Sequence, residues 1–281
     1  MPADSVRCGR ISYTNDLPVY AAFDVDALPF PGTMMSDVPA GLNAALLAGG
    51  LDCSPISSAF YAEHADAFVL LPDICIGSRS DVLSISCISQ RPVAELRGTP
   101  IAVTSESATG TALLATLCRR WYGFAPQLMA HDDPFALYTR DSTPCLLIGD
   151  AAIEARFSVP EKNIHDLGRM WHECSGEGMV YAVWAVRRAF AAHQPQAVQM
   201  VLSALRESLR WSRQHHRTII ERAQAVHYRP TDFYERYYAT LTFDFDEAAR
   251  HGLRAFFEAA HACGVLGVAP ALQFVREAQH V

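Results

Sequence analysis

Strand patterns and helix patterns alternate along this chain, and the alternation begins a second time near residue 90. The first series predicts strands at residues 6–13, 51–53 and 68–77, with helices at 39–48 and from Ser57. The second series predicts strands at 100–104, 127–131 and 145–148, with helices at 105–122 and from Ala151. Strands that alternate with helices are typical of α/β units with largely parallel pairing. Two such series, followed by helical patterns at the C-terminus, predict an α/β fold with two lobes.

Two further strand patterns are expected to connect the lobes. Residues 82–89 alternate with period two, and residues 179–187 form a long apolar run. Because these strands bracket the second series, we place the crossings near residues 88–92 and 178–182. Lobe 1 is then discontinuous, with residues 1–90 and 180–281, and lobe 2 contains residues 91–179. Ligands of open α/β sheets bind beyond the carboxyl ends of the strands, so we expect a ligand cleft between the lobes.

Composition and charge exclude several classes of protein. Half of the 281 residues are hydrophobic and 19% are charged, which excludes a disordered or fibrous chain. The chain has 23 basic and 30 acidic residues, a net charge of −7. Nucleic-acid binding needs a basic stripe that displaces counterions from phosphates. The arginines between residues 206 and 222 instead recur as on the solvated face of one helix, so we predict no nucleic-acid partner.

Neither a membrane segment nor a metal site is predicted. No apolar run approaches the roughly 20 residues of a membrane span, and residues 1–10 contain no apolar segment typical of a secretory signal. We therefore expect a cytoplasmic protein with no membrane partner. The eight cysteines include no Cys-x-x-Cys pair, and the eleven histidines form no His-Glu-x-x-His motif. This spacing favours reduced thiols over a disulfide framework or a metal centre.

Polar side chains gather where predicted strands give way to helices. Asn15 follows the first strand, either as a turn former or as an amide that binds a ligand in the cleft. Ser57 and Ser58 follow a strand that Ser54-Pro55 is expected to break. These paired hydroxyls suit an anion site or a plain helix cap, and the sequence leaves both open.

The segment 104–110 is the most informative of these junctions. It carries four hydroxyls where one is enough to cap a helix, and Gly110 allows close approach. This excess favours a carboxylate or phosphate held by backbone N–H groups and hydroxyls. Asp150 follows a buried strand and is expected either to face the cleft or to cap the next helix. With no nucleophile elbow and no dinucleotide fingerprint, the residues predict a protein that binds a small organic anion.

Six short motifs occur along the chain in a specific order and spacing. They are Arg-Ile-x-Tyr-x-Asn-x-Leu-Pro at 10–18, Ser-Pro-Ile-Ser-Ser at 54–58, Leu-Pro-Asp at 71–73, Thr-Ser-Glu-Ser-Ala-Thr at 104–109, Leu-Ile-Gly-Asp at 147–150, and Asp-Leu-Gly at 166–168 with Trp171. Together they resemble the chorismate dehydratase family of the futalosine route to menaquinone. The resemblance implies a fold like the type II periplasmic binding proteins. It also implies conversion of chorismate, a dianionic substrate, to 3-[(1-carboxyvinyl)oxy]benzoate and water, with no cofactor.

The same resemblance implies roles for individual residues. Asn15 is implied to lie nearest the chemistry, where a neutral amide orients the substrate or assists the leaving hydroxyl. The base is then the enolpyruvyl carboxylate of the substrate or Asp150. The implied carboxylate-binding residues are Ser57, Ser58, Ser105, Ser107 and Thr109.

Two other functions remain as alternatives. A sister enzyme of the same pathway, 1,4-dihydroxy-6-naphthoate synthase, has the same fold. It usually carries a Cys-Pro-Asn-Asp-like opening, so residues 13–18 count against it. A non-catalytic protein that binds small anions is the alternative from another class, and the absence of a predicted signal segment counts against that reading.

Overall fold

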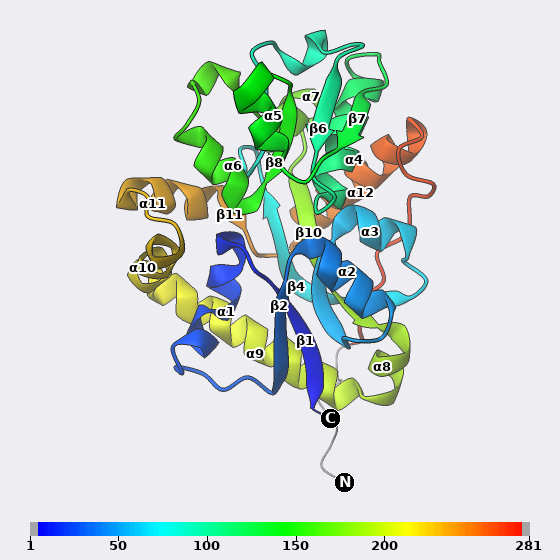
Figure 1. Ribbon diagram of the computed structural model, residues 1–281. Coiled ribbons are helices and arrows are strands. Elements are labelled where there is room, and N and C mark those ends of the chain that lie inside the picture. Colours follow the sequence, from blue (N-terminus) through cyan, green and yellow to red (C-terminus); the bar gives the residue numbers. More distant parts are fainter. Residues whose placement is uncertain (1–4, 277–281) are drawn as a thin grey trace.

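The computed structural model describes residues 5–276, which form two β-sheets (Figure 1). The six-stranded sheet has the order β11-β4-β10-β3-β1-β2, and the five-stranded sheet has the order β7-β6-β8-β5-β9. The first contains β1 (Val6–Ile11), β2 (Gly32–Asp37), β3 (Cys53–Ser57), β4 (Phe68–Ser78), β10 (Met179–Arg187) and β11 (Leu241–Thr242). The second contains β5 (Ile85–Ile88), β6 (Pro100–Val103), β7 (Gln127–Ala130), β8 (Cys145–Ile148) and β9 (Ile164–Asp166). We call the parts built on these sheets lobe 1 and lobe 2.

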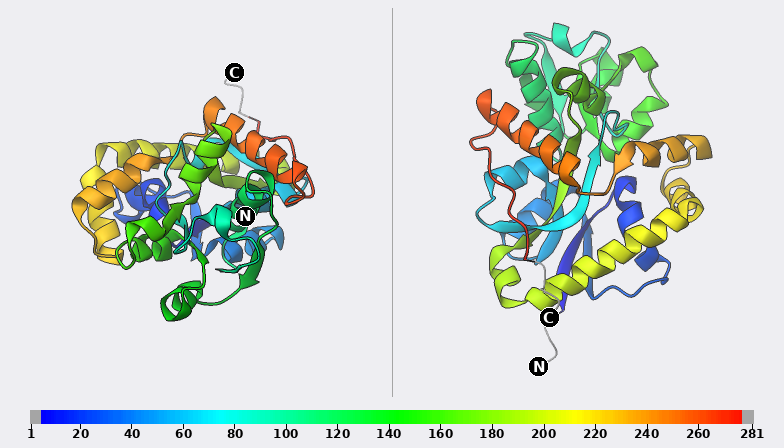
Figure 2. Two further views of the ribbon diagram at one scale, coloured as in Figure 1. Left: turned by 90° about the horizontal axis from the view of Figure 1, so that it is seen from above. Right: turned by 180° about the vertical axis from the view of Figure 1, so that it is seen from behind.

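Helices pack around both sheets. Those before β10 are α1 (Leu17–Asp24), α2 (Pro39–Leu47), α3 (Ser58–Glu63), α4 (Ala108–Arg120), α5 (Pro134–Asp141), α6 (Gly149–Arg156) and α7 (Leu167–Ser175). Those after it are α8 (Arg188–His193), α9 (Pro195–Gln214), α10 (His216–Val226), α11 (Thr231–Thr240) and α12 (Glu247–Ala262). One face of α9, which includes Val198, Leu202 and Leu205, is apolar and buried, and α9 packs on α1. Seen from behind, α12 runs along the junction of the lobes, where it contacts α3, α4 and β10 (Figure 2).

The predicted α/β class is confirmed, but one predicted boundary between the lobes was wrong. β5 pairs antiparallel with β8 and β9, so it belongs to lobe 2 and not to a lobe ending at residue 90. The first crossing is therefore the segment 79–84, between β4 and β5, and not 88–92. The period-two pattern identified a strand, but such a pattern does not specify the sheet that the strand joins. The second crossing, residues 176–178, overlaps the predicted 178–182 at its first residue.

Two details of lobe 1 also differ from the sequence predictions. β3 continues through Pro55, which pairs with Trp184 of β10, although we expected a break there. β1 pairs with β3 only at Cys53, so the missing N–H of Pro55 interrupts no ladder with β1. The edge strand β2 was not predicted, because its residues are exposed along most of its length and show no apolar alternation.

This topology places the site. β1 and β3 are parallel in lobe 1, and β6 and β8 are parallel in lobe 2. Residues at or just after the carboxyl ends of all these strands line one cleft between the lobes. This is the position expected for ligands of open α/β sheets. Within residues 5–276, no helix is both long enough and apolar enough to span a bilayer.

Candidate active site

The cleft is narrow and receives polar side chains from both lobes. Its volume is about 60 Å³, well below the roughly 300 Å³ at which small-molecule pockets usually begin. Its polar lining includes Tyr13, Asn15 and Ser57 from lobe 1, and Ser84, Glu106 and Ser107 from the crossing segment and lobe 2. The lobes are therefore closed on each other, and a ligand of ordinary size requires them to separate.

Asn15 lies on a short 3₁₀ turn, Thr14–Asp16, directly after β1. α1 starts next, with Pro18 in its first turn, where a proline removes no needed donor. The Asn15 side chain lines the cleft, and its Oδ1 is buried without a hydrogen-bond partner in the described structure. Buried polar atoms are normally paired, and this amide oxygen is available to accept a hydrogen bond from a bound molecule.

Ser107 provides a similar unpaired group on the opposite wall. It occupies the N-cap position of α4, but its hydroxyl makes no capping bond. The Ser107 residue is only 5% exposed, and yet its Oγ has no partner among the described residues. The first N–H groups of α4 lie beside it and carry the positive end of the helix dipole. A carboxylate in the cleft could accept from both the hydroxyl and these N–H groups.

Hydrogen bonds join the lobes across the cleft. The Tyr13 hydroxyl donates to Glu106 Oε2 at 2.6 Å. Burial, together with the Glu106 carboxylate, raises the pKa of Tyr13, so the phenol keeps its proton and donates. The Thr109 hydroxyl accepts from the Ala59 N–H at 3.2 Å and donates to the Tyr181 carbonyl at 3.0 Å. Thr109 therefore lines the cleft with a hydroxyl that already joins the two lobes.

Asp150 also joins the lobes, from the first turn of α6. Its Oδ1 accepts from the Thr14 hydroxyl at 2.5 Å and from the Thr14 N–H at 3.2 Å, and His227 Nε2 lies 3.5 Å from Oδ2. Burial raises the pKa of Asp150, while the Thr14 donors and His227 oppose the shift. Asp150 does not line the cleft. It holds the turn that carries Asn15.

Glycine allows the close approach at this contact. Gly149 has a φ of +55°, and a Cβ there would lie 2.7 Å from the Tyr13 ring. A side chain at this position would be strained and would push Tyr13 away. Gly149 therefore lets the end of β8 lie directly against the turn after β1.

Of the site residues expected from the sequence, four line the cleft: Asn15, Ser57, Ser107 and Thr109. The Ser57 N–H donates to Asn43 Oδ1 at 3.1 Å, which fixes this end of β3. Ser58 is completely buried beside the cleft, and Ser105 is exposed to solvent, so neither lines it. Sequence reasoning missed Tyr13, Ser84 and Glu106. Tyr13 and Glu106 stood inside the quoted motifs, but no pattern marked them as partners.

No metal site accompanies the cleft. Within residues 5–276, no three His, Cys, Asp or Glu side chains come together as metal ligands do. All eight cysteines are free thiols, and most are buried in the core.

Comparison with known proteins identifies the family. Residues 6–262 match the sequence model of a family described as menaquinone biosynthesis. This chain belongs to that family. A curated relative, the chorismate dehydratase of Thermus thermophilus, is 31% identical over 267 residues, which cover 89% of this chain and 93% of the relative.

Solved structures place this family member in the periplasmic-binding-protein fold, as predicted. A protein from Archaeoglobus fulgidus superposes with a TM-score of 0.77 at 18% identity, over 95% of this chain and all of the other. A Candida albicans protein described as having the generic periplasmic binding protein fold gives 0.69 at 10% identity, over 99% of both chains. The alkanesulfonate-binding protein of Xanthomonas axonopodis gives 0.67 at 16% identity, over 98% of this chain and 97% of the other.

Proposed function

We propose that this protein is a chorismate dehydratase, which converts chorismate to 3-[(1-carboxyvinyl)oxy]benzoate and water. The observation that carries the proposal is the 31% identity with a curated chorismate dehydratase over 89% of the chain. The cleft supports it, because Asn15 of lobe 1 and Ser107 of lobe 2 both line it and each has a side-chain oxygen without a partner among the described residues. We also propose that the reaction is a cofactor-independent hydro-lyase reaction.

The chemistry asks little of the protein beyond positioning. The hydrogen on the ether-bearing ring carbon and the hydroxyl on its neighbour leave, and the ring becomes aromatic. The substrate carries two carboxylates, and the start of α4 with Ser107 suits one of them. Ser57, at the end of β3, is the second hydroxyl that we assign to carboxylate binding. The Asn15 amide can donate to the leaving hydroxyl without bringing a charge.

The proton acceptor is best supplied by the substrate. Asp150 receives hydrogen bonds from Thr14 and does not line the cleft, which argues against Asp150 as the base. Glu106 lines the cleft, but it accepts from Tyr13. Asn15 is a neutral amide and a poor base. We therefore favour the enolpyruvyl carboxylate of chorismate, which the lobes would hold beside the acidic ring hydrogen.

Substrate entry requires the lobes to open. A cleft of about 60 Å³ cannot hold a ring that carries a carboxylate and an enolpyruvyl ether. Opening must break the Tyr13–Glu106 and Thr14–Asp150 hydrogen bonds, which re-form when the lobes close. Closure would then exclude water and place Asn15 and Ser107 on the substrate together.

Incubation of the purified protein with chorismate tests this function. Liquid chromatography with mass detection should show an aromatic product one water lighter than chorismate, above a protein-free control. Tight binding of chorismate without any product would instead indicate the non-catalytic anion-binding alternative. If chorismate is neither bound nor converted, it is excluded as the substrate. The alternative function is then that of a 1,4-dihydroxy-6-naphthoate synthase. A cytoplasmic location stays a prediction.

A further inference from the structure

The cleft residue Ser84 lies on a segment that crosses between the two sheets. β4 ends at Ser78 in lobe 1 and β5 begins at Ile85 in lobe 2, so residues 79–84 form the crossing. Ser84 lines the cleft, and its backbone carbonyl accepts the Gly149 N–H at 2.8 Å. The Ser84 hydroxyl donates to the Val82 carbonyl at 3.4 Å, so the direction of its side chain depends on the backbone just before it.

That backbone is strained. Leu83 has a φ of +61°, in the left-handed region that a leucine rarely adopts. Its side chain is nevertheless buried in the core. A non-glycine residue keeps such a conformation only where its surroundings over-determine it. The contacts around Leu83 show what does so.

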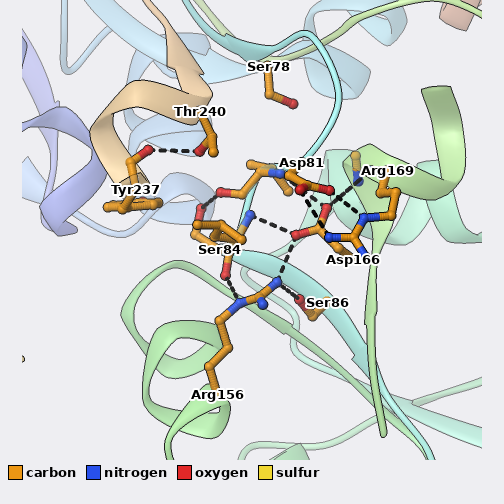
Figure 3. Close-up of polar contacts among 12 residues, drawn as sticks. Ser78, Asp81, Ser84, Ser86, Arg156, Asp166, Arg169, Tyr237 and Thr240 are labelled. Atoms are coloured by element: carbon orange, nitrogen blue, oxygen red, sulfur yellow. Dashed lines mark hydrogen bonds and ion pairs between the residues drawn. The ribbon is translucent and has the colours of Figure 1, made fainter. Parts of the chain in front are cut away.

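Two side chains of lobe 2, the buried Asp166 and the partly buried Arg156 (Figure 3), hold both backbone polar groups of Leu83. Asp166, at the end of β9, accepts the Leu83 N–H at 2.8 Å and the Val82 N–H at 3.1 Å. Arg156, at the end of α6, donates from Nε to the Leu83 carbonyl at 2.6 Å. Arg156 and Asp166 are themselves paired at 2.8 Å. The pair thus encloses Leu83 from its N–H to its carbonyl.

Asp166 is anchored independently of the crossing. It is 5% exposed, and its Oδ1 also accepts the Gly168 and Arg169 N–H groups, at 3.0 and 3.2 Å, at the start of α7. Arg156 also reaches Ser86 Oγ of β5, at 3.3 Å. Because the pair is fixed to β5, β9 and α7, residues 82–84 move with lobe 2 when the lobes separate.

We propose that Asp166 and Arg156 are positioning residues for the cleft: they hold Leu83 in its left-handed conformation and so present Ser84 to the bound substrate. The catalytic part of this inference rests on the proposed chorismate dehydration, whereas the structural part does not. Asp81 supplies a matched comparison, because it lies on the same crossing and pairs with Arg169 at 2.6 Å. That pair is more exposed and holds no backbone group of Leu83.

A double-mutant cycle with Ser84 tests the proposal. Asparagine at 166 still caps α7 but presents only one accepting oxygen to these N–H groups. We expect D166N to lower kcat/KM for chorismate by about 10- to 100-fold, the range for a small misplacement of reacting groups. In an S84A background, D166N should lower kcat/KM little further. D81N should leave kcat/KM within about twofold of the wild type.

Several results would overturn the proposal. D166N could lower kcat/KM by the same factor in the wild-type and S84A backgrounds. Its effect would then be a structural disturbance unrelated to Ser84. Full activity of S84A would show that presenting Ser84 serves no catalytic purpose. If D166N does not fold, R156K enters the same cycle, since lysine keeps the charge but loses the planar fork.

A crystal structure of D166N or R156K tests the structural part without any substrate. We expect Leu83 to return to a negative φ and Ser84 to leave the cleft. A left-handed Leu83 with Ser84 in place would refute the positioning role. If the wild-type protein fails to dehydrate chorismate, the proposed function falls, while this structural result still decides the role of the Asp166–Arg156 pair.

Discussion

Replacing Asp150 by asparagine, and Thr14 by valine, separates a holding role for Asp150 from a proton-accepting one. Thr14 donates both its hydroxyl, at 2.5 Å, and its N–H to the buried Asp150 carboxylate. Valine removes the hydroxyl, keeps the N–H and nearly preserves the shape. One hydrogen bond to a charged group contributes about 1.5–3 kcal/mol. If that bond forms only in the closed state, its loss lowers kcat/KM by about 10- to 150-fold.

The double variant T14V/D150N provides the decisive comparison. If Asp150 only holds the turn that carries Asn15, the double variant should be no slower than the slower single variant, because both changes break the same contact. E154Q is the control: Glu154 lies one turn further along α6 and contacts His227 but not Thr14. Stopped assays of product formation at several chorismate concentrations give kcat and KM. The opposite result has two parts: the losses of kcat/KM in the two single variants add up in the double variant, and D150N alone abolishes kcat and removes one limb of its pH profile. That result would show that Asp150 is the base.

Three further predictions concern the cleft and the turn after β1. E106Q should keep kcat within about tenfold and lower KM for chorismate by about fivefold, because it removes a negative charge beside a dianion but keeps an oxygen that accepts from Tyr13. A large loss of kcat at unchanged KM would make Glu106 the proton acceptor. S107A should raise KM by about 10- to 150-fold through one lost bond to a carboxylate, and an unchanged KM in folded protein would leave Ser107 as a plain helix start. Asp16 is completely buried, and burial raises its pKa to about 8 from 3.8. Since the folded state then holds the proton more tightly, the wild type should lose stability relative to D16N as pH rises from about 4 to 8, by up to roughly 1 kcal/mol per pH unit; urea titrations that show a constant difference would contradict this.

The strands that the sequence identified most clearly are buried on both faces. β4, β8 and β10 are nearly continuous apolar runs, and such runs are visible without any knowledge of their neighbours. β2 was missed because it is exposed along most of its length and exists through its pairing with β1. β5 was found but assigned to the wrong lobe. Pairing between strands distant in sequence is a tertiary property that local periodicity does not contain.

For the site, the sequence predicted the positions of the segments but not the directions of their side chains. The motifs located the segments that line the cleft, including those with Asn15, Ser57 and Ser107. They did not give side-chain directions, since neighbouring residues at a strand-to-helix junction point different ways. Ser105 therefore faces solvent while Ser107 faces the cleft, and α4 begins at Ala108 and not at residue 105.

The sequence did not predict contacts between residues that lie far apart along the chain. Tyr13 and Glu106 are 93 residues apart, and Thr14 and Asp150 are 136 residues apart. Each pair forms only because the two lobes close. The interpretation of Asp150 as a possible base followed from the family resemblance, whereas its hydrogen bonds to Thr14 indicate a holding role.

The turnover of chorismate by the wild type and by N15A tests the central claim most directly. The Asn15 side chain lines the closed cleft, and an amide N–H donor aimed at developing charge typically contributes about 10²–10³ in rate. We predict that the wild type forms 3-[(1-carboxyvinyl)oxy]benzoate, and that N15A lowers kcat by that factor while KM moves little. A correctly folded N15A with wild-type kcat, or a wild type that forms no product, would contradict the account.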